Sequence, residues 1–253
     1  SGASVEMIGA VGGDRFGEKL LANLGAEDGL SSAYVRRVSD ASTGVALITV
    51  DSDSENAIVV VPGANAALAP TDVADVEIED DAVALSQFEV PQPTIRAFFE
   101  TAREQGARTV LNPAPAEDVR DDFLELVDYL VVNETEAQFY SDADPDGQLS
   151  TGDLVETAAG LRVHDEQVVV VTLGGRGVFA STPAETFTLD AYAVDPVDTT
   201  GAGDAFVGAF ATALGDGIAL REALDIGTSA GALATTEAGA APSLPARAAI
   251  EEL

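Results

Sequence analysis

The sequence predicts an α/β fold in which helices cover a mostly parallel sheet. Short runs rich in β-branched residues alternate with stretches whose apolar residues recur at helical spacing. The run Val168-Val-Val-Val-Thr-Leu173 is apolar on both faces, as a buried parallel strand should be. A helical stretch follows most of the later runs, and parallel strands are usually joined by such a crossover. These three observations favour an α/β class over an all-β or all-α protein.

The expected elements follow one another in a regular order along the chain. The strands are predicted at 5–10, 45–50, 57–61, 82–87, 108–112, 129–133 and 167–173. The helices are predicted at 94–105, 117–126, 134–140, 154–163, 202–214 and 219–235. No internal repeat and no linker divides the chain, so we expect a single domain over 1–253.

The segment 42–65 departs from this order. It holds two strand patterns joined by the polar turn Asp51-Ser-Asp-Ser-Glu-Asn56, with no helix between them. This pattern predicts a β-hairpin. In an α/β protein such a hairpin is either an extension of the sheet edge or a lid over a site. The residues taken alone favour the edge extension.

The charge is strongly acidic and excludes several classes of partner. The 253 residues include 44 Asp and Glu against 12 Lys and Arg, which gives a formal net charge of -32, and Lys19 is the single lysine. Nucleic acids and anionic membranes need a basic surface, so neither is expected as a partner. Because 46% of the residues are hydrophobic, we expect a folded protein with an acidic surface, as in salt-adapted, halophilic organisms.

Other features indicate a cytoplasmic protein without a metal site built from Cys and His. There is no Cys, no apolar run long enough to span a bilayer and no signal-peptide pattern at the first residues. His164 is the single histidine and lies in a polar stretch before a strand. We therefore expect it to be exposed and to have no catalytic role.

The segment with the clearest chemistry is Asp198-Thr-Thr-Gly-Ala-Gly-Asp-Ala-Phe206, which follows the extended stretch 191–197 and opens a helix. Gly201 and Gly203 let a ligand approach the backbone closely. Free amides at a helix start form an anion site. Asp204 is then either an acidic first-turn residue that stabilises the helix dipole, or a base that accepts a proton during phosphoryl transfer. The Walker A pattern Gly-x-x-x-x-Gly-Lys-Ser/Thr is absent.

This segment resembles the carboxy-terminal signature of the PfkB/ribokinase family of carbohydrate kinases. Further segments resemble ribokinases and are found along nearly the whole chain: Gly9-Ala-Val-Gly-Gly-Asp14 with Gly17, Ser42-Thr-Gly44, Val61-Pro-Gly-Ala-Asn65, Asn112-Pro-Ala-Pro115, Asn133-Glu-Thr-Glu136, Thr172-Leu-Gly-Gly-Arg-Gly177 and Gly239-Ala-Ala-Pro-Ser243. The resemblance implies a ribokinase-like three-layer α/β/α fold, with 42–65 as part of a small β lid.

The resemblance also implies roles for individual residues toward ATP and Mg²⁺. Asp204 is the implied catalytic base, and the amides of Gly201, Ala202 and Gly203 hold the charge that develops on the γ-phosphate. The residues implied at the nucleotide are Asn133, Glu136, Thr172, Gly174, Gly177 and Thr228, with Glu136 reaching Mg²⁺ through water.

Two further sets follow from the resemblance. Glu89 falls at a sugar-contacting position. The residues implied at a monovalent-cation site, usually K⁺, are Asp198, Thr200, Ala234, Gly239 and Ser243.

Several of these residues have a structural interpretation as well. Asn133 to Glu136 is also the pattern of a helix N-cap with acidic first-turn residues. Asp198 fits a carboxylate that caps its own loop. Arg176 is either a phosphate contact or a polar residue in a tight turn, and the second interpretation is favoured.

The function implied is ATP-dependent transfer of the γ-phosphate to a sugar hydroxyl, most specifically D-ribose to ribose 5-phosphate. Fructokinase and 2-keto-3-deoxygluconate kinase are close alternatives, and nucleoside kinases a more distant one. Another alternative is a protein that binds nucleotide without turnover. The sequence lacks three features of the family: its opening strand, the substrate Asp on that strand and a Gly-Gly-Lys-Gly-Ala-Asn segment. We therefore expect weak turnover from residues 1–253 alone. A homodimer formed through the lids is a further implication.

A dinucleotide-dependent oxidoreductase does not fit the sequence. The segment Gly9-Ala-Val-Gly-Gly-Asp14 lacks the Gly-x-Gly-x-x-Gly spacing and the later acidic ribose partner.

Overall fold

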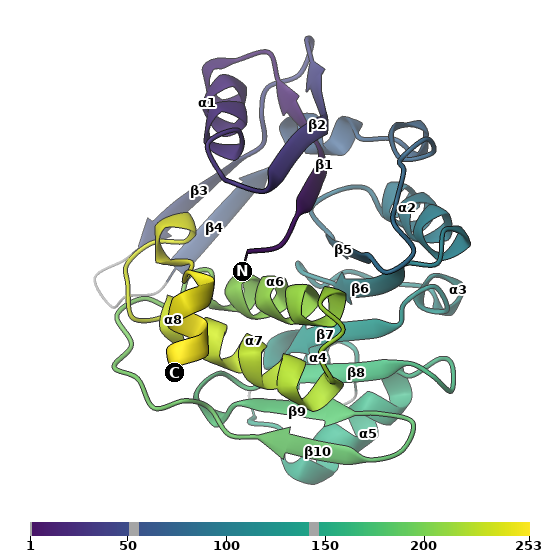
Figure 1. Cartoon of the computed structure of the whole chain (residues 1–253), viewed down its shortest axis with the longest axis vertical. Coiled ribbons are helices and arrows are strands. Elements are labelled where there is room, and N and C mark those ends of the chain that lie inside the picture. Colours follow the sequence, from purple (N-terminus) through teal and green to yellow (C-terminus); the bar gives the residue numbers. More distant parts are fainter. Residues whose placement is uncertain (1, 51–55, 142–146) are drawn as a thin grey trace. The chain divides into compact units, whose positions relative to one another are not determined.

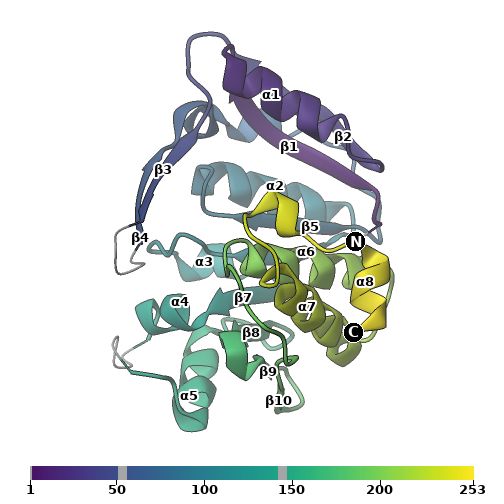
Figure 2. The same ribbon diagram turned by 90° about the vertical axis from the view of Figure 1, so that its left-hand side faces the viewer.

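A computed structural model of the chain describes residues 2–50, 56–141 and 147–253. It divides into two compact units, shown in Figures 1 and 2. Unit 1 comprises Ser1–Gly2, Ile78–Phe88 and Ala102–Leu253, and unit 2 comprises Ala3–Glu77 and Glu89–Thr101. Within the described residues, no helix has the length and apolar character that crossing a membrane requires.

Unit 1 is built on a six-stranded sheet with the order β10-β9-β8-β7-β6-β5. Its strands are β5 (Val83–Gln87), β6 (Arg108–Asn112), β7 (Tyr129–Asn133), β8 (Val168–Thr172), β9 (Val178–Ser181) and β10 (Thr186–Leu189). The strands β5 to β8 pair in parallel, whereas β9 and β10 are antiparallel to their neighbours. The prediction of an α/β fold with a mostly parallel sheet is confirmed.

Helices cover both faces of this sheet, as Figures 1 and 2 show. On one face lie α6 (Ala202–Gly215) and α7 (Leu220–Ala234), and on the other lie α4 (Glu134–Phe139) and α5 (Thr151–Leu161). Two further short helices are α3 (Asp121–Leu124) and α8 (Arg247–Glu252), and short 3₁₀ turns occur at Gly174–Arg176 and Ala241–Ser243.

The apolar pattern of β8 explains why it can lie inside the sheet. Four consecutive valines of β8 are buried, so both faces of the strand are covered. On the α6 side, Val170 belongs to a cluster with Phe206 and Phe210 of the helix. Phe210 also meets Tyr129 edge to face, with ring centroids 5.7 Å apart.

The orientation of α6 places its first turn at the end of the sheet where the parallel strands finish, here called the carboxyl edge. Arg108, the first residue of β6, donates from Nη2 to the carbonyl of Leu214 at 2.6 Å. The last turn of α6 therefore lies at the amino ends of the strands. The 14 residues of the helix extend about 20 Å, and a five-residue strand about 16 Å. The start of α6 thus reaches the carboxyl edge, where α/β proteins bind their ligands.

Unit 2 contains the parallel pair β1 (Val5–Gly12) and β2 (Leu30–Val38), joined through α1 (Arg15–Leu24). The predicted hairpin is confirmed as β3 (Val45–Val50) and β4 (Asn56–Val61), which pair antiparallel. The centre of its turn, 51–55, lies outside the described residues. The remaining elements of unit 2 are the 3₁₀ turns Gly63–Ala67 and Pro70–Asp72 and the larger part of α2 (Gln92–Glu104).

A dense polar junction joins the hairpin to β1 and α1. Asp14 caps α1 by accepting from the Gly17 amide at 2.9 Å, and it also accepts from Thr43 Oγ1 at 2.6 Å and from the Thr43 amide at 2.8 Å. The buried Thr43 hydroxyl in turn accepts from the Gly12 amide at 3.0 Å. The hydrogen bonds that Asp14 accepts lower its pKa to about 2, and the bond from the Thr43 hydroxyl has the largest effect. The Gly-Gly-Asp segment therefore has a structural role in fixing the hairpin root.

The structure corrects several details of the sequence analysis. The helix expected at 117–126 is limited to α3, because Arg120 is extended. The helix α5 begins earlier than expected, after a cap from Ser150. The expectation that His164 is exposed was wrong, since its ring is half-buried and its Nε2 lies 3.0 Å from the Val127 carbonyl.

The elements missed altogether were α1, β2, β9, β10 and α8. The single domain over 1–253 stays a prediction.

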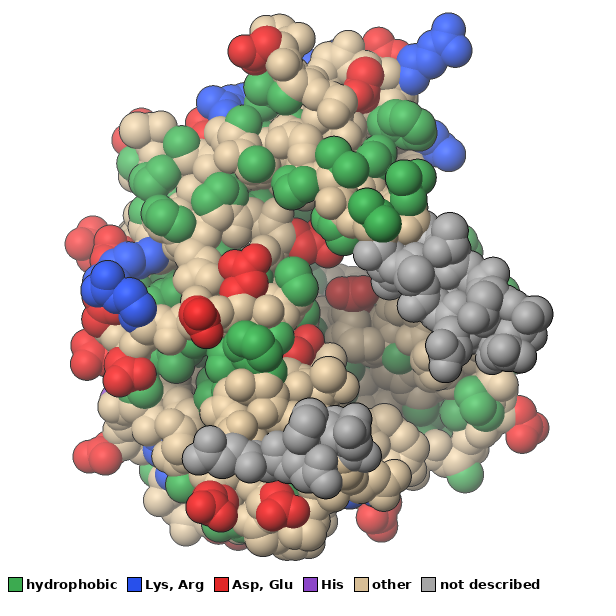
Figure 3. Space-filling model, turned by 180° about the vertical axis from the view of Figure 1, so that it is seen from behind, with side chains coloured by type: hydrophobic (Ala, Val, Ile, Leu, Met, Phe, Trp, Pro, Cys, Tyr) green, Lys and Arg blue, Asp and Glu red, His purple; other side chains and the backbone are tan. Residues whose placement is uncertain are grey.

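The acidic composition is visible on the surface. In Figure 3, Asp and Glu side chains are scattered over the face shown, and Lys and Arg are few. The described arginines are largely engaged in ion pairs with neighbouring carboxylates.

Candidate active site

The start of α6 offers free backbone amides. Gly201 precedes the helix in the left-handed conformation, with φ of 80°, which glycine adopts without strain. The amide of Ala202, which the resemblance implied as a donor to the developing charge, is not free, because it closes a turn by donating to the Thr199 carbonyl at 3.2 Å. The amides of Gly201, Gly203 and Asp204 have no hydrogen-bond partner among the residues that the structure describes. They sit at the positive end of a long helix and form a fitting site for a phosphoryl group.

Asp204 lies in the same turn with its carboxylate exposed. Within the described ranges this carboxylate takes part in no hydrogen bond or ion pair. The carboxylate is therefore available to a ligand and is not held in a structural contact. Free amides and a free carboxylate within one turn are the minimum parts for holding an anion and accepting a proton beside it.

Asp198 fixes the loop that leads into this turn. Its Oδ1 accepts from the Thr200 amide at 2.9 Å, and its Oδ2 accepts from the Gly239 amide at 2.8 Å. These two hydrogen bonds lower the pKa of Asp198, and the bond from the Gly239 amide has the larger effect. The amide of Asp198 donates to the Thr235 carbonyl at 3.1 Å. The loop before α6 is thus tied to the loop after α7, as the loop-capping interpretation of Asp198 expects.

The predicted cation residues lie in these same two loops. Ser243 is buried, and its hydroxyl donates to the Ala240 carbonyl at 2.8 Å. Ala234 is the last residue of α7 and is buried. Asp198, Thr200 and Gly239 are directly linked by the hydrogen bonds just described. The cation site itself stays a prediction.

Polar residues end each parallel strand at the carboxyl edge. Gln87 of β5 is in register with Asn112 of β6, and Asn133 of β7 is in register with Thr172 of β8. Asn112 was singled out in the sequence only as part of a resembling segment. Its Nδ2 donates to the Val131 carbonyl at 2.9 Å and to Glu136 Oε2 at 3.4 Å.

Asn133 and Glu136 form a reciprocal cap at the start of α4. Asn133 Oδ1 accepts from the Glu136 amide at 2.8 Å, while Glu136 Oε2 accepts from the Asn133 amide at 2.8 Å. Glu136 Oε1 also accepts from Asn133 Nδ2 at 2.9 Å. Burial raises the pKa of Glu136. The helix-capping interpretation of this motif is therefore correct, and its role toward ATP stays a prediction.

The carboxylate oxygens of Glu136 are the kind of ligand that Mg²⁺ prefers. Glu136 accepts two hydrogen bonds at Oε2 and one at Oε1, so Oε1 keeps an acceptor position for a water-mediated contact. Within the described ranges, no group of three or more His, Cys, Asp or Glu side chains is arranged to hold a metal ion. Mg²⁺ commonly binds through one or two carboxylates and substrate phosphates, so a single carboxylate such as that of Glu136 is a suitable donor.

The turn after β8 is shaped by glycine. Gly174 and Gly177 have φ values of 56° and 88°, and a Cβ on Gly177 would lie 2.0 Å from the Leu189 carbonyl oxygen. Between them, Arg176 forms an ion pair with Glu134 and donates to the Leu149 carbonyl at 3.1 Å. The interpretation of Arg176 as a polar residue in a tight turn agrees with these contacts. Glu134 and Leu149 were not expected at this site.

Two predicted residues are not brought into this set by a described contact. Thr228 is buried in α7, where its hydroxyl donates to the Leu224 carbonyl at 2.8 Å. Glu89 is exposed and belongs to unit 2. Their roles at adenine and at the sugar stay predictions.

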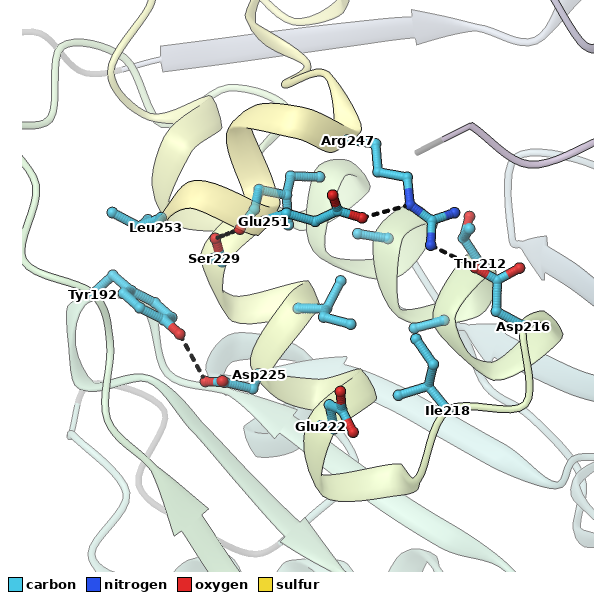
Figure 4. Close-up of a pocket in the computed structure, with 14 residues that line it drawn as sticks. Tyr192, Thr212, Asp216, Ile218, Glu222, Asp225, Ser229, Arg247, Glu251 and Leu253 are labelled. Atoms are coloured by element: carbon cyan, nitrogen blue, oxygen red, sulfur yellow. Dashed lines mark hydrogen bonds and ion pairs between the residues drawn. The ribbon is translucent and has the colours of Figure 1, made fainter.

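A separate pocket of about 360 Å³ lies between α6, α7 and α8 (Figure 4). Thr212 and Asp216, in and just after the last turns of α6, line it, so it lies at the opposite end of that helix from Asp204. Arg247 bridges Asp216 at 3.0 Å and Glu251 at 2.9 Å across it. None of the predicted site residues lines this pocket.

Comparison with known proteins places this geometry in a family. The model of the pfkB family of carbohydrate kinases matches residues 1–247. A ribokinase of Haemophilus influenzae is 35% identical over 248 residues, which cover 97% of this chain and 80% of that relative. A deoxyribokinase of Salmonella typhi is 33% identical over 213 residues, which cover 83% of this chain and 68% of that relative.

Solved structures agree with the sequence relatives. The structure of Arabidopsis thaliana ribokinase complexed with ribose and ATP superposes with a TM-score of 0.84 and 28% sequence identity, covering 98% of this chain and 80% of that chain. With the glycine-lined helix start, the free Asp204 and the polar carboxyl edge already described, these matches lead to one assignment. The chain belongs to the pfkB family of carbohydrate kinases.

Proposed function

We propose that the protein transfers the γ-phosphate of ATP to D-ribose and forms ribose 5-phosphate. The observation that carries this proposal is the first turn of α6, where free amides and the free Asp204 carboxylate lie together at the carboxyl edge. The ribokinase relative at 35% identity and the structural neighbour that binds ribose and ATP support the choice of substrate.

The residues of α6 suit an in-line displacement. Asp204 would accept the proton of the attacking sugar hydroxyl as that oxygen bonds to the γ-phosphorus, and the bond to the ADP oxygen would break on the other side. The amides of Gly201, Gly203 and Asp204 would stabilise the charge on the transferring group. Bound Mg²⁺ would neutralise charge on the phosphates, and Glu136 would contact it through water.

The substrate is tested by a panel of acceptors. The protein is expressed from the start codon of its gene and assayed with D-ribose, 2-deoxyribose, fructose and 2-keto-3-deoxygluconate at fixed MgATP. We expect kcat/KM for ribose to exceed that for the others by at least about 10-fold. A site built to bind the 2-hydroxyl of ribose rejects 2-deoxyribose, which lacks it, and the two six-carbon acceptors differ from ribose in size. A preference for fructose or 2-keto-3-deoxygluconate would refute the ribose assignment.

The alternative of a nucleotide-binding protein without turnover is tested in the same experiment. Tight MgATP binding with no phosphate transfer to any acceptor would favour it over the kinase. The proposed cation site is tested by replacing K⁺ with Na⁺ or choline. Equal rates in all three salts would count against a cation held by Asp198 and its neighbouring loops.

A further inference from the structure

Three residues form a polar clasp between two turns at the carboxyl edge. Arg176, in the turn after β8, donates from Nη1 to the Leu149 carbonyl at 3.1 Å and forms an ion pair with Glu134 through Nη2. Glu134 Oε1 also accepts from the Leu149 amide at 2.7 Å. Each member of this Arg176 clasp therefore contacts the other two.

The clasp connects the two turns that are predicted to bind the nucleotide. Glu134 directly follows Asn133 at the start of α4. Arg176 lies between Gly174 and Gly177 in the turn that follows Thr172. Because β7 and β8 are adjacent and parallel, these two turns leave the sheet side by side. The guanidinium spans the gap between them.

The turn after β8 is held by its own backbone hydrogen bonds and by the close packing of Gly177 against Leu189, but its Gly174–Gly175 side is open. A Cβ placed on Gly174 or Gly175 would meet no atom within 4 Å, so that side of the turn is open. Glycines also allow more backbone conformations than other residues. Arg176 is the side chain that connects this turn to the neighbouring one, and the charge-assisted bonds that it makes are stronger than neutral ones.

The contacts of Arg176 argue against a direct phosphate ligand. Its charge is paired with Glu134, and both of its Nη atoms already donate. The two side chains are 38% and 25% exposed, so the pair is partly shielded from solvent. Three of the five N–H donors are not used in these contacts, so it is the charge that disfavours a phosphate: the Glu134 carboxylate already neutralises the guanidinium and would repel a phosphate placed beside it.

We propose that Arg176 is a positioning residue for nucleotide binding. It holds the Gly174–Arg176 turn at a fixed distance from the Asn133 turn, so that both can contact one nucleotide. This inference rests on the proposed function, because it takes the two turns as the ATP site. A nucleotide that binds before the turns are ordered must order them, and this lowers its apparent affinity.

Binding measurements on a double-mutant cycle test the inference. MgATP affinity is measured by calorimetry for the wild type, Arg176→Ala, Glu134→Ala and the double variant. We expect each single variant to weaken MgATP binding about 10-fold and the double variant to do no worse, because either change opens the same clasp. The KM for ribose should change less than about 2-fold, since the clasp acts on the nucleotide turns.

Two outcomes of this cycle would overturn the inference. If Arg176→Ala weakens binding while Glu134→Ala leaves or improves it, Arg176 is a direct phosphate ligand. Fully additive losses would mean that the two residues act separately. Arg176→Lys should recover part of the affinity, because one ammonium cannot reproduce both directions of the guanidinium fork. Arg120→Ala removes the same charge from a side chain that is 82% exposed and serves as the control.

Hydrogen exchange without nucleotide separates this inference from the proposed function. The amide of Gly177 donates to the Gly174 carbonyl at 3.0 Å, and the amide of Leu149 donates to Glu134. Both should exchange faster in Arg176→Ala, and in Arg176→Gln if the alanine variant folds poorly. Unchanged exchange would overturn the positioning role even if the wild type binds MgATP. Faster exchange in a protein that binds no MgATP would instead refute the proposed function and leave the clasp as a structural feature.

Discussion

Replacing Gly201 by alanine tests how the chain presents its amides at the start of α6. Gly201 has φ of 80°, and a Cβ at this position would lie 3.3 Å from the Cα of Ala240. The left-handed conformation costs a residue with a Cβ about 1–2 kcal/mol. The close approach to Ala240 adds to this cost, because backbone atoms on both sides would have to move.

A glycine in the same helix provides the matched control. Gly208 lies within α6, and a Cβ on it would meet nothing within 4 Å. Replacing a helical glycine by alanine stabilises a protein by about 0.5–1 kcal/mol. The two substitutions add the same methyl group to one element, so their opposite signs isolate the effect of backbone conformation.

Thermal melts and kinetics of both variants provide the assay. At about 2–4 °C per kcal/mol for a chain of this size, Gly201→Ala should lower Tm by about 2–8 °C, and Gly208→Ala should raise it by about 1–4 °C. Gly201→Ala should also lower kcat, since a shifted turn moves the amides and Asp204, whereas Gly208→Ala should leave kcat unchanged. A Gly201→Ala variant as stable as the wild type would refute the conformational argument.

Three further predictions concern the hairpin root and the acidic surface. Thr43→Val leaves the Gly12 amide without its acceptor and should lower the free energy of unfolding, measured in urea, by about 1–3 kcal/mol. The control Thr188→Val makes the same change at an exposed position and should leave the free energy of unfolding unchanged. Equal effects of the two substitutions would contradict this reasoning. Because the Asp14 pKa is lowered from 3.8 to about 2, its contribution should be complete above pH 4 and lost as the pH falls toward 2. The stability difference between wild type and Asp14→Asn should therefore shrink over that range in acid unfolding, and a constant difference would argue against it. With a net charge of -32, the Tm should rise from dilute buffer to molar KCl, and an unchanged Tm would show that self-repulsion does not limit stability.

The parts of the fold that the sequence predicted share a strong local pattern. β8 is a continuous valine run, and α6 repeats apolar residues at helical spacing after a glycine-rich start. Both patterns report burial directly, so their assignment did not depend on distant residues. The four-residue strand β10 could not be identified in this way, because so short a segment gives no period to count.

In the candidate site, too, the parts made of consecutive residues were predicted and the parts made of distant residues were not. The Gly201 to Asp204 turn was predicted because anion binding at a helix start depends on consecutive residues. The clasp of Arg176 with Glu134 and Leu149 was not, since its members lie 42 and 27 positions from the arginine. Sequence spacing does not report such contacts, which arise only once β7 and β8 are paired.

Asn133 and Glu136 show a third situation. The pattern of these residues predicted a helix cap, and the family resemblance implied a nucleotide contact. The structure contains the cap, with Glu136 only 7% exposed. A capping residue at the carboxyl edge remains close to any ligand bound there, so the two roles are physically compatible.

The most direct test of the account is the turnover of Asp204→Asn. The substitution keeps the size of the side chain and removes its charge and basicity. We predict that kcat falls by about 10²–10⁴-fold while MgATP affinity stays within about 3-fold of the wild type. Asp165→Asn makes the same change at an exposed position remote in sequence from α6 and should leave both quantities unchanged. An Asp204→Asn enzyme with near-wild-type kcat would contradict the assignment of the α6 turn as the phosphoryl-transfer site.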